Sequence, residues 1–488
     1  MKINSNNIVT DGVRITPREK DYSQWYLDII KAADLAEYGP VKGTMIIKPD
    51  GLSIWEKIKQ VLDERFFDLG VKNMYFPMLI PERFLKKEES HVEGFSPEVA
   101  VVTYAGGEKL EEALVIRPTS ETIIYDSFSK WIQSYNDLPL LMNQWANVVR
   151  WELRPRLFLR TTEFLWQEGH TAHQTNDDAD SFAKTILDIY KNLAEEFMAI
   201  PVVVGEKSDS EKFAGADKTY TVEAMMSDGK SLQFATSHNL GQNFSKAFNI
   251  QFSDENNNKI FVWQTSWGLS TRTIGGLIMV HSDDKGLVLP PKIAPVRVVI
   301  IPVWGLEKDK ENVLRVAQEL HDKLVLIYDN RSIVIDETNA RLGYKHYFWE
   351  KKGVPLRIEI GPRDIKNNSV VIVRRDLSEK ENVATPNLTD RINFLLEDIQ
   401  QNLYKRAKDK LDLKTVQVTD WKQFVVNIEK GNFVIAYWDG TKQTEEEIKK
   451  ETKSTVRCIL EDITKSDKNI CVFSGQSANK KALFARNY

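Results

Sequence analysis

The chain has 488 residues, of which 42% are hydrophobic and 28% charged, a composition typical of a soluble protein with about three domains. Its formal net charge of −4 argues against a polycation that binds nucleic acid over its whole surface, although local basic patches can meet a tRNA-sized partner. Two cysteines cannot build a disulfide framework, residues 1–12 lack the apolar core of a secretory signal, and no apolar run reaches the roughly 18 residues of a membrane span. We therefore expect a cytoplasmic protein without a membrane segment.

The first 290 residues predict a domain built mainly from antiparallel strands. Apolar residues at helical spacing indicate helices over 53–69 and 182–197, and an apolar strand that closes at Pro77 follows the first of them. Further short strands are expected over 114–117, 201–207, 218–226, 230–238 and 258–268. Because these strands follow one another with few helices between them, we expect an α+β domain over residues 1–290.

The prolines at 290, 291 and 295 indicate a domain boundary. The continuous apolar run Val298–Ile301 beyond them is typical of a buried strand, and helices and strands then alternate in the order βαβαββα. This pattern predicts an α/β domain with a mixed sheet over residues 296–408. A smaller α+β module is expected over 411–488.

The run from Val148 to His173 carries the densest set of polar groups. Arg150 and Glu152 lie two residues apart, an arginine-rich turn follows, and Trp166, Glu168 and His170 are again two residues apart. Since residues i, i+2 and i+4 of a strand share one face, we expect two neighbouring strands to point polar groups into one cavity. Such a floor can hold a small charged substrate beside a polyphosphate. A cross-strand salt bridge is the open alternative for the Arg-x-Glu pair.

Two further arginines extend this pattern. Arg160 precedes Phe164, and a guanidinium suits bidentate phosphate contacts while an aromatic face suits a stacked adenine. Gly268, Ser270 and Arg272 are also spaced by two, so Arg272 is a second candidate phosphate clamp and Gly268 lets a ligand approach the backbone. The alternative is a glycine-rich turn with a surface arginine.

Thr119 and Glu121 follow the short strand over 114–117. A carboxylate in this position can hold an ammonium group. The alternative is a helix N-cap by Thr119 or Ser120, with Glu121 in the first turn of the helix. Both interpretations can be true together.

Other candidates are weaker. His170 and His173 have a metal-like spacing, but the run is extended and no third ligand is near, so we expect no metal. Gln233, Thr236 and His238 stand at a probable strand end. Neither a P-loop nor a dinucleotide fingerprint is present, which excludes those two nucleotide sites.

Taken in order, these constellations resemble the three signature motifs of class II aminoacyl-tRNA synthetases. The runs RPTSE, VVRWE, FLWQEGHTAH, EKFAGA, TSHNLGQNFSKAF, TSWGLSTRTIGG and GLVLPPKIAP are similar to those of prolyl-tRNA synthetases of the archaeal and eukaryotic type. WEKKGVPLRIEIGPRD and LFARNY resemble the anticodon-binding and C-terminal modules of that family. The resemblance covers about residues 20–488. It implies an antiparallel-sheet catalytic domain followed by an α/β anticodon-binding domain and a small C-terminal module.

The resemblance implies activation of L-proline with ATP and Mg²⁺, and transfer of proline to tRNA(Pro) by a homodimer. It implies a proline pocket formed by Thr119, Glu121, Arg150, Trp166, Glu168, His170, His238 and Ser270. It implies an ATP site formed by Arg150, Glu152, Arg160, Phe164, Gln233, Thr236 and Arg272, in which Phe164 stacks on adenine and Arg160 and Arg272 grip the outer phosphates. Catalytic roles fall to Arg150, Glu152 and Arg272. Glu350 and Arg357 match base-reading positions of the anticodon module, with a surface salt bridge as the alternative.

Two features depart from common patterns of the family. The interval between the second and third motifs has no room for the large editing domain of some relatives, so we expect no editing in cis. Many relatives hold zinc with a C-x₄-C and a C-x-x-C pair, but those positions here are Asp439 and Thr444, then Cys471 and Ser474. A single thiolate cannot make the usual tetrahedral site, so we expect no structural zinc.

Two rival functions stay open. A related class II enzyme charging threonine, serine or glycine is disfavoured by the set from Thr119 to His170 described above. A catalytically silent paralogue that binds tRNA or regulates predicts erosion of Arg150, Glu152 or Arg272 and loss of the anticodon module. The sequence retains all of them.

Overall fold

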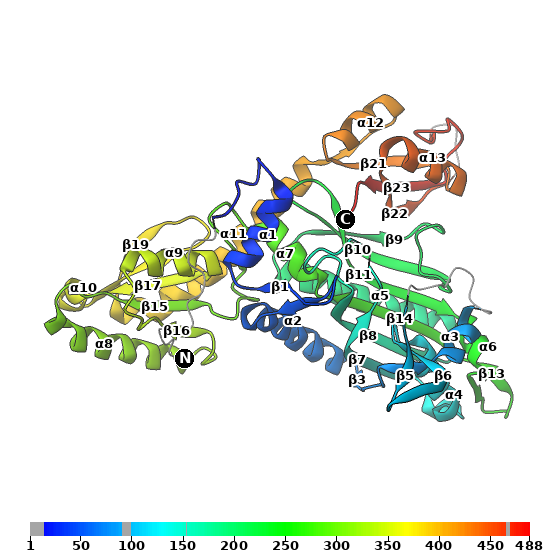
Figure 1. Cartoon of the computed structure of the whole chain (residues 1–488). Coiled ribbons are helices and arrows are strands. Elements are labelled where there is room, and N and C mark those ends of the chain that lie inside the picture. Colours follow the sequence, from blue (N-terminus) through cyan, green and yellow to red (C-terminus); the bar gives the residue numbers. More distant parts are fainter. Residues whose placement is uncertain (1–13, 90–98, 153, 465–468) are drawn as a thin grey trace.

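An 11-stranded sheet forms the centre of the structure, a computed structural model that describes residues 14–89, 99–152, 154–464 and 469–488. Its strands run from edge to edge in the order β20 (Thr415–Gln417), β21 (Phe433–Trp438), β23 (Lys480–Ala485), β22 (Thr455–Asp462), β9 (Val202–Glu206), β10 (Lys218–Met225), β11 (Ser231–Gly241), β14 (Trp263–Ser270), β8 (Glu163–His173), β7 (Leu140–Val149) and β3 (Lys72–Asn73) (Figure 1). Neighbours pair antiparallel, except that β20 and β3 pair in parallel at the two ends. The polar start of the chain, on which the expectation of no secretory signal depends, lies outside the described residues.

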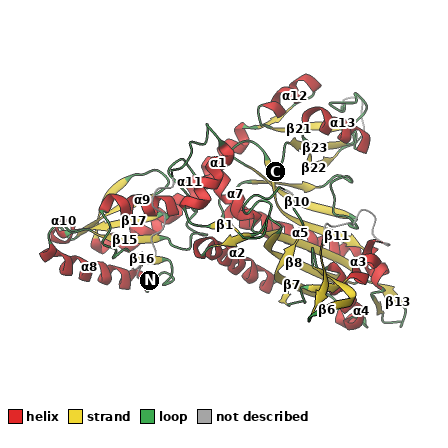
Figure 2. Ribbon diagram, viewed as in Figure 1, coloured by secondary structure: helices red, strands yellow, loops and turns green. Residues whose placement is uncertain are grey.

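Two helices cover one face of this sheet (Figure 2): α2 (Pro49–Asp68), and α5 (Asn176–Asn192) with a π-helical turn over Leu193–Phe197. The Trp267 ring of β14 contacts Phe66 of α2 and Phe182 of α5, at centroid distances of 4.8 and 6.5 Å. Because side chains of a strand alternate between faces, positions 166, 168 and 170 of β8 and 266, 268 and 270 of β14 face away from these helices. That second face carries the candidate site.

Shorter elements complete this part of the chain. The helices are α1 (Tyr22–Ala32), α3 (Glu82–Glu89), α4 (Glu121–Trp131), α6 (Asn243–Phe248) and α7 (Arg272–His281), with a 3-10 turn at Tyr135–Asp137. Three small antiparallel groups join β1 (Ala36–Tyr38) to β2 (Met45–Ile47), β12 (Gln251–Ser253) to β13 (Lys259–Phe261), and β4 (Leu79–Pro81) and β5 (Ala100–Ala105) to β6 (Glu108–Ile116). Among the described residues, no helix is long and apolar enough to span a membrane.

Two predicted strands differ in the structure. The strand expected to close at Pro77 pairs only over Lys72–Asn73, because the Phe76 amide donates to the Gln144 side chain instead of a neighbouring strand. The strand expected over 258–268 divides into β13 and β14, since β13 pairs with β12 in a hairpin of its own. The helices expected over 53–69 and 182–197 are confirmed, with longer N-terminal ends.

A five-stranded sheet lies beyond the proline-rich boundary, in the order β16 (Ile333–Ile335), β15 (Val298–Pro302), β17 (Leu356–Ile360), β18 (Ser369–Arg374) and β19 (Lys380–Ala384). The first three are parallel and the last two antiparallel, so the predicted mixed sheet is confirmed. Its helices are α8 (Glu307–Val325), α9 (Leu342–Lys352), α10 (Pro362–Lys366) and α11 (Leu388–Leu413). The long helix α11 leads from this sheet to the C-terminal strands (Figure 1).

The C-terminal strands extend the large sheet instead of forming one of their own. With α12 (Trp421–Glu429) and α13 (Lys442–Thr452) they make a small layer, and β22 meets β9 where Ile459 pairs with Glu206. A buried ion cluster lies at this junction. The Glu223 carboxylate of β10 accepts from Lys207 at 2.8 Å and from Arg457 of β22 at 3.0 Å.

Candidate active site

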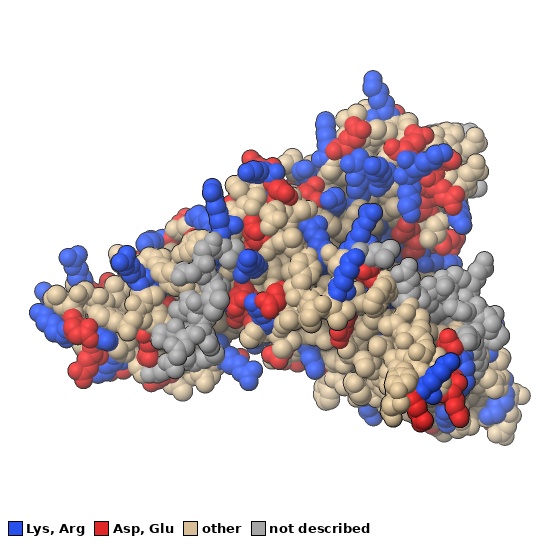
Figure 3. All heavy atoms as spheres, viewed as in Figure 1, with Lys and Arg blue, Asp and Glu red and all other residues tan. Residues whose placement is uncertain are grey.

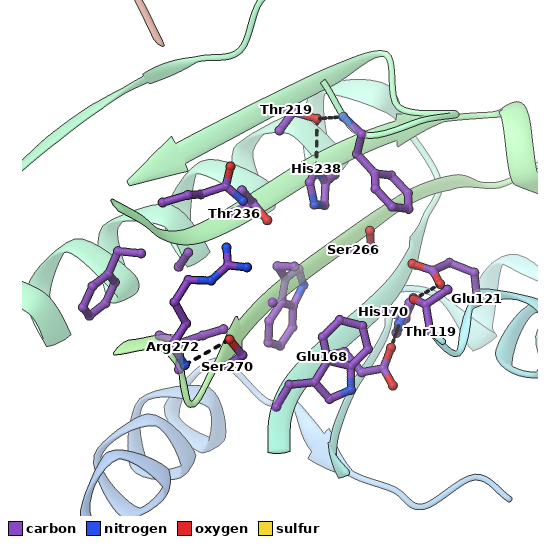
Figure 4. A pocket seen from close by; sticks show the side chains of 18 of the residues that line it. Thr119, Glu121, Glu168, His170, Thr219, Thr236, His238, Ser266, Ser270 and Arg272 are labelled. Atoms are coloured by element: carbon purple, nitrogen blue, oxygen red, sulfur yellow. Dashed lines mark hydrogen bonds and ion pairs between the residues drawn. The ribbon is translucent and has the colours of Figure 1, made fainter. Parts of the chain in front are cut away.

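A cavity of about 290 Å³ opens on the free face of the large sheet (Figure 4). Strands β8, β11 and β14 form its floor, and the start of α4 and the start of α7 close its ends. Sixteen residues have predicted roles, and fourteen of these roles concern proline, ATP or catalysis. Twelve of the fourteen residues line the cavity: Thr119, Glu121, Arg150, Phe164, Trp166, Glu168, His170, Gln233, Thr236, His238, Ser270 and Arg272. Residues that were singled out from separate parts of the sequence therefore lie around one cavity in the structure.

One corner of the cavity is acidic. Glu168 is buried, and its carboxylate accepts hydrogen bonds from the Gln144 amide at 2.8 Å and from the Ser120 hydroxyl. The same carboxylate lies 3.2 Å from Nε2 of His170. Glu121 is buried in the first turn of α4, where its carboxylate accepts from the Thr119 hydroxyl. Both interpretations of this motif hold in part, since Glu121 begins a helix and also lines the cavity.

The two carboxyl groups of this corner differ in their pKa values. Burial raises the pKa of Glu121, and the nearby charge of Glu168 raises it further. Burial alone would also raise the pKa of Glu168, but hydrogen bonds from His170, Ser120 and Gln144 outweigh it and lower that pKa. Glu168 is therefore the negative charge of the corner, able to receive an ammonium group.

Arginines occupy the opposite part of the cavity. Arg150 donates from Nε to the Pro118 carbonyl at 3.0 Å, and its guanidinium lies 5.2 Å from the centroid of Trp166 and 5.6 Å from that of Phe164. Arg272 donates from Nε to the Leu159 carbonyl at 3.2 Å. Neither guanidinium forms an ion pair with a carboxylate of the described residues. Each uses its Nε to fix its direction and keeps the remaining donors for a ligand.

The environment of these cations favours an anion. Desolvation among packed neighbours lowers the pKa of Arg150. Burial, then the like charges of Arg150 and Arg160, lower the pKa of Arg272 to about 10. Cations that repel one another in a partly dry cavity become more stable when a negative ligand arrives.

His238 is held in one orientation by a residue that the motif search did not single out. The Thr219 hydroxyl accepts from the Phe213 amide at 3.0 Å and lies 2.9 Å from His238 Nδ1. Since burial lowers the pKa of His238 to about 3, with His170 adding to the shift, the ring is neutral. Because the Thr219 hydroxyl already accepts from the Phe213 amide, its own proton is free to donate to Nδ1, and this arrangement favours a ring proton on Nε2 of His238.

Two predicted site residues, Glu152 and Arg160, lie outside the cavity lining. The strand ends near the predicted residues also differ from expectation. β7 ends at Val149, so Arg150 and Glu152 follow the strand instead of lying on it. The chain turns away there, and the Glu152 carboxylate lies 3.7 Å from Arg160 Nε. Gln233, Thr236 and His238 were expected at a strand end but lie within β11, because that strand continues to Gly241.

Sequence reasoning assigned no role to eight residues of the cavity lining: Glu211, Phe213, Thr219, Phe234, Ala235, Ser266, Trp267 and Leu269. Two of these residues pair directly with predicted site residues. Thr219 pairs with His238 across β10 and β11, and Ser266 pairs with His170 across β14 and β8. The strands were expected, but their register was not, and register decides which side chains meet.

The indole Nε1 of Trp166 is a further unused donor. It is buried and has no hydrogen-bond partner among the described residues. A buried N–H without a partner costs free energy unless a ligand or water accepts from it. Trp166 is therefore ready to donate into the cavity.

Comparison with known proteins identifies the family. Residues 104–281 match the tRNA synthetase class II core domain (G, H, P, S and T), residues 297–395 the anticodon binding domain, and residues 421–488 the C-terminal domain of prolyl-tRNA synthetase. The proline–tRNA ligase of Chlorobaculum tepidum is 53% identical over 97% of this chain and 99% of its own length. Those of Chlorobium chlorochromatii and Chlorobium limicola are 52% and 51% identical with the same coverage. The chain belongs to the prolyl-tRNA synthetase family.

Membership of the prolyl-tRNA synthetase family confirms the predicted fold class and does not support the silent paralogue. It also limits one expectation. The relatives named here are bacterial proteins, so the archaeal and eukaryotic type is not supported.

The two predicted anticodon residues line a second cavity of about 220 Å³, in the part that matches the anticodon binding domain. Glu350 comes from α9 and Arg357 from β17, and His346, Arg374 and Lys380 lie around them. The alternative of a salt bridge between the two predicted residues is not what the structure has. Arg357 pairs with Glu359 at 2.9 Å, and Glu350 lies 3.6 Å from Lys285.

Of the four positions that correspond to zinc cysteines in many prolyl-tRNA synthetases, three are joined by side-chain hydrogen bonds here. Asp439 accepts from the Thr444 hydroxyl at 2.8 Å and the Ser474 hydroxyl at 2.6 Å, while Thr441 donates from its amide and hydroxyl at 3.0 and 2.9 Å. Cys471 is buried nearby in the apolar core of this module. Within the described residues, no group of three or more His, Cys, Asp or Glu side chains could hold a metal ion.

Proposed function

We propose that this chain is a proline–tRNA ligase, which activates L-proline with ATP and transfers the prolyl group to tRNA(Pro). The observation that carries the proposal is one cavity with a buried carboxylate corner at one end and, at the other, two guanidinium groups that form no ion pair with any described carboxylate. An amino acid has a cationic and an anionic end, and ATP is a polyanion. A cavity with this polarity orients both.

The acidic corner suits the imino group of proline. Glu168 supplies the negative charge, and Glu121, with its raised pKa, adds a second carboxyl group without doubling that charge. The side chain of Trp166 supplies an aromatic wall for the ring and an unused N–H. The carboxylate of proline then points towards Arg150.

The arginine side suits the triphosphate. The proline carboxylate attacks the α-phosphorus, the bond to pyrophosphate breaks, and prolyl-adenylate forms. Negative charge grows on the phosphoryl oxygens in this step, so fixed guanidinium groups supply most of the stabilisation. Arg150 lies between the two substrates and Arg272 holds the outer phosphates. The acceptor-end hydroxyl of tRNA then takes the prolyl group, and AMP leaves.

Mg²⁺ is expected with ATP in this family. The residues present fit an ion held mainly by the phosphates and water, because the described part of the chain offers single carboxylates such as Glu152 and no group of three or more converging ligands. Such an ion would neutralise phosphate charge, and Glu152 would have to leave Arg160 to contact it.

Several finer expectations accompany this proposal. The domain limits 1–290, 296–408 and 411–488, the cytoplasmic location, the homodimer and the base-reading roles of Glu350 and Arg357 remain proposals. Absence of editing in cis and of structural zinc also remain predictions. The archaeal and eukaryotic subtype would need a preference for tRNA(Pro) of that type, measured against a bacterial tRNA(Pro).

The deciding experiment is amino-acid-dependent exchange between ATP and pyrophosphate. Proline should support exchange, and threonine, serine and glycine should not. Exchange that depends on one of those three amino acids would overturn the assignment. Rapid hydrolysis of alanyl-tRNA(Pro) by the purified protein would overturn the expectation of no editing.

A further inference from the structure

A third cavity, of about 210 Å³, lies apart from the active site where the large sheet meets helix α11. Its cationic side chains come from separate segments. Arg406 and Lys410 are four residues apart on one face of α11, and Arg18 precedes α1. Among the residues that the structure describes, no aspartate or glutamate lines this cavity, so the three cations have no carboxylate beside them in its described lining.

These cations have no strong partners within the part of the chain that is described. Lys410 donates from Nζ to the Ser227 carbonyl at 2.8 Å, and Arg406 reaches only the Asp376 carbonyl at 3.5 Å. The Arg18 guanidinium lies over the Trp25 ring at 5.5 Å. None of the three forms an ion pair with a described carboxylate.

Nearby acids do not remove this positive charge. Asp228 is the carboxylate that acts on Lys410, but it already accepts from Tyr488 at 2.7 Å and Lys230 at 2.9 Å. Burial and the charges of Arg18 and Lys414 lower the pKa of Lys410 to about 8. His281, at the base of the cavity, donates from Nε2 to the Met198 carbonyl and has a pKa lowered by burial to about 4, so it is neutral.

We propose that this cavity is a binding site for a phosphate group, held by Arg18, Arg406 and Lys410. Two guanidinium groups and one ammonium group, supplied by two segments of the chain, offer enough donors for the several oxygens of a tetrahedral anion, more than the two oxygens of a carboxylate need. The phosphate belongs either to the backbone of bound tRNA or to a free anion such as inorganic phosphate. The site goes beyond the proposed ligase function, since it shares no lining residue with the active-site cavity.

The first arm of the test uses inorganic phosphate on the full-length protein, with chloride at matched ionic strength as the reference. Phosphate at about ten times its Kd should raise the melting temperature of the wild type by about 2 °C. Lys410→Gln and Arg406→Gln should lose this rise. Lys405→Gln is the matched control, because Lys405 is exposed on the same helix and does not line the cavity.

The second arm measures the affinity of the same variants for tRNA(Pro) at several salt concentrations. If a tRNA phosphate occupies the site, Lys410→Gln should weaken binding by about threefold to tenfold and reduce the salt slope by about one. Loss of the phosphate effect with normal tRNA affinity identifies a free anion instead. Proline-dependent exchange should stay normal in all variants, which also shows that they are folded.

The proposal fails if Lys410→Gln and Arg406→Gln behave like Lys405→Gln in both arms. It also fails if phosphate raises the melting temperature of every variant equally. Because Arg406 is exposed, its substitution tests the site even if the substitution of the more buried Lys410 disturbs the helix. If proline-dependent exchange is normal but phosphate does not bind, the phosphate-site proposal is wrong and the ligase assignment is unaffected.

Discussion

Two clusters of charged side chains lie on the same large sheet, and they differ in how their charges are paired. At the junction with the C-terminal strands, Glu223 receives Lys207, Arg457 and two hydroxyl groups, and its pKa falls to about 2 although burial opposes this. In the active-site cavity, the guanidinium groups of Arg150 and Arg272 donate to backbone carbonyls and form no ion pair with a carboxylate of the described residues. The first cluster satisfies its carboxylate internally, while the second leaves cations for a ligand.

The difference separates structural charges from functional ones. A buried charge that has an opposite partner and hydrogen bonds fixes two parts of the fold in one arrangement. A charge left without a partner costs stability in the free protein, and that cost is offset when substrate binds. Figure 3 shows many Lys, Arg, Asp and Glu side chains on one face of the molecule, so surface charge alone would not distinguish these sites.

The largest expected effect comes from the unpaired cations. Arg150→Ala and Arg272→Ala should each lower proline-dependent exchange by about 10³-fold or more, equal to about 4 kcal/mol of transition-state stabilisation. Stability should change little, because neither side chain has an ion partner to strand. Arg154→Ala, an exposed arginine of the same loop, is the control and should leave exchange unchanged. Wild-type exchange in either active-site variant would show that these arginines do not act on the substrates, which would contradict the distinction between structural and functional charges.

The paired cluster around Glu223 should show the opposite result, a large loss of stability on substitution. Glu223→Gln leaves Lys207 and Arg457 buried without their anion, so the free energy of unfolding should fall by about 3 kcal/mol or more in urea titrations. Glu461→Gln, an exposed glutamate on β22, should change it by less than about 0.5 kcal/mol. A Glu223 variant as stable as that control would show that the cluster does not hold the two parts together.

The same cluster predicts a pH dependence of stability. The folded-state pKa of Glu223 is about 2, below the ordinary 4.5 of a glutamate. A depressed carboxyl pKa stabilises the fold above the unfolded value, and this contribution disappears as the pH falls from about 4.5 towards about 2. The difference in unfolding free energy between wild type and Glu223→Gln should therefore shrink over that range. A difference that stays constant between pH 6 and pH 3 would contradict the assigned pairing.

The contrast between the clusters also explains what the sequence could predict. Spacing by two placed Trp166, Glu168 and His170 on one face of a strand, because alternation along a strand is a local rule. The position of Glu152 could not be predicted in this way, since the end of β7 depends on where its neighbours stop pairing. The partners of Thr219 and Glu223 depend on the register between paired strands, which residue spacing within one strand does not fix.

A neutral group provides an intermediate case. Thr219→Val removes the hydroxyl that sets the proton of His238 on Nε2, so kcat/KM for proline or ATP should fall by about tenfold, or about 1.4 kcal/mol. Thr219→Ser keeps the hydroxyl and should restore most of the activity. The tautomer can be read from the ¹⁵N shifts of the ring in wild type and variants. Equal activity of the Val and Ser variants would leave Thr219 with a packing role only.

The smallest effect should come from Asp439, a carboxylate whose hydrogen-bond partners among the described residues are neutral hydroxyl and amide groups. Asp439→Asn weakens its bonds with Thr441, Thr444 and Ser474 but strands no buried cation, so the free energy of unfolding should fall by only about 1 kcal/mol. Purified protein should contain no stoichiometric zinc, and a chelator should not change its stability, since hydroxyl groups occupy positions where thiolates would be needed. If Asp439→Asn instead lowered the free energy of unfolding as much as Glu223→Gln, hydrogen bonding rather than charge pairing would determine how much these two carboxylates stabilise the fold. Bound zinc in metal analysis would show that Cys471 has ligand partners other than the corresponding positions in this chain.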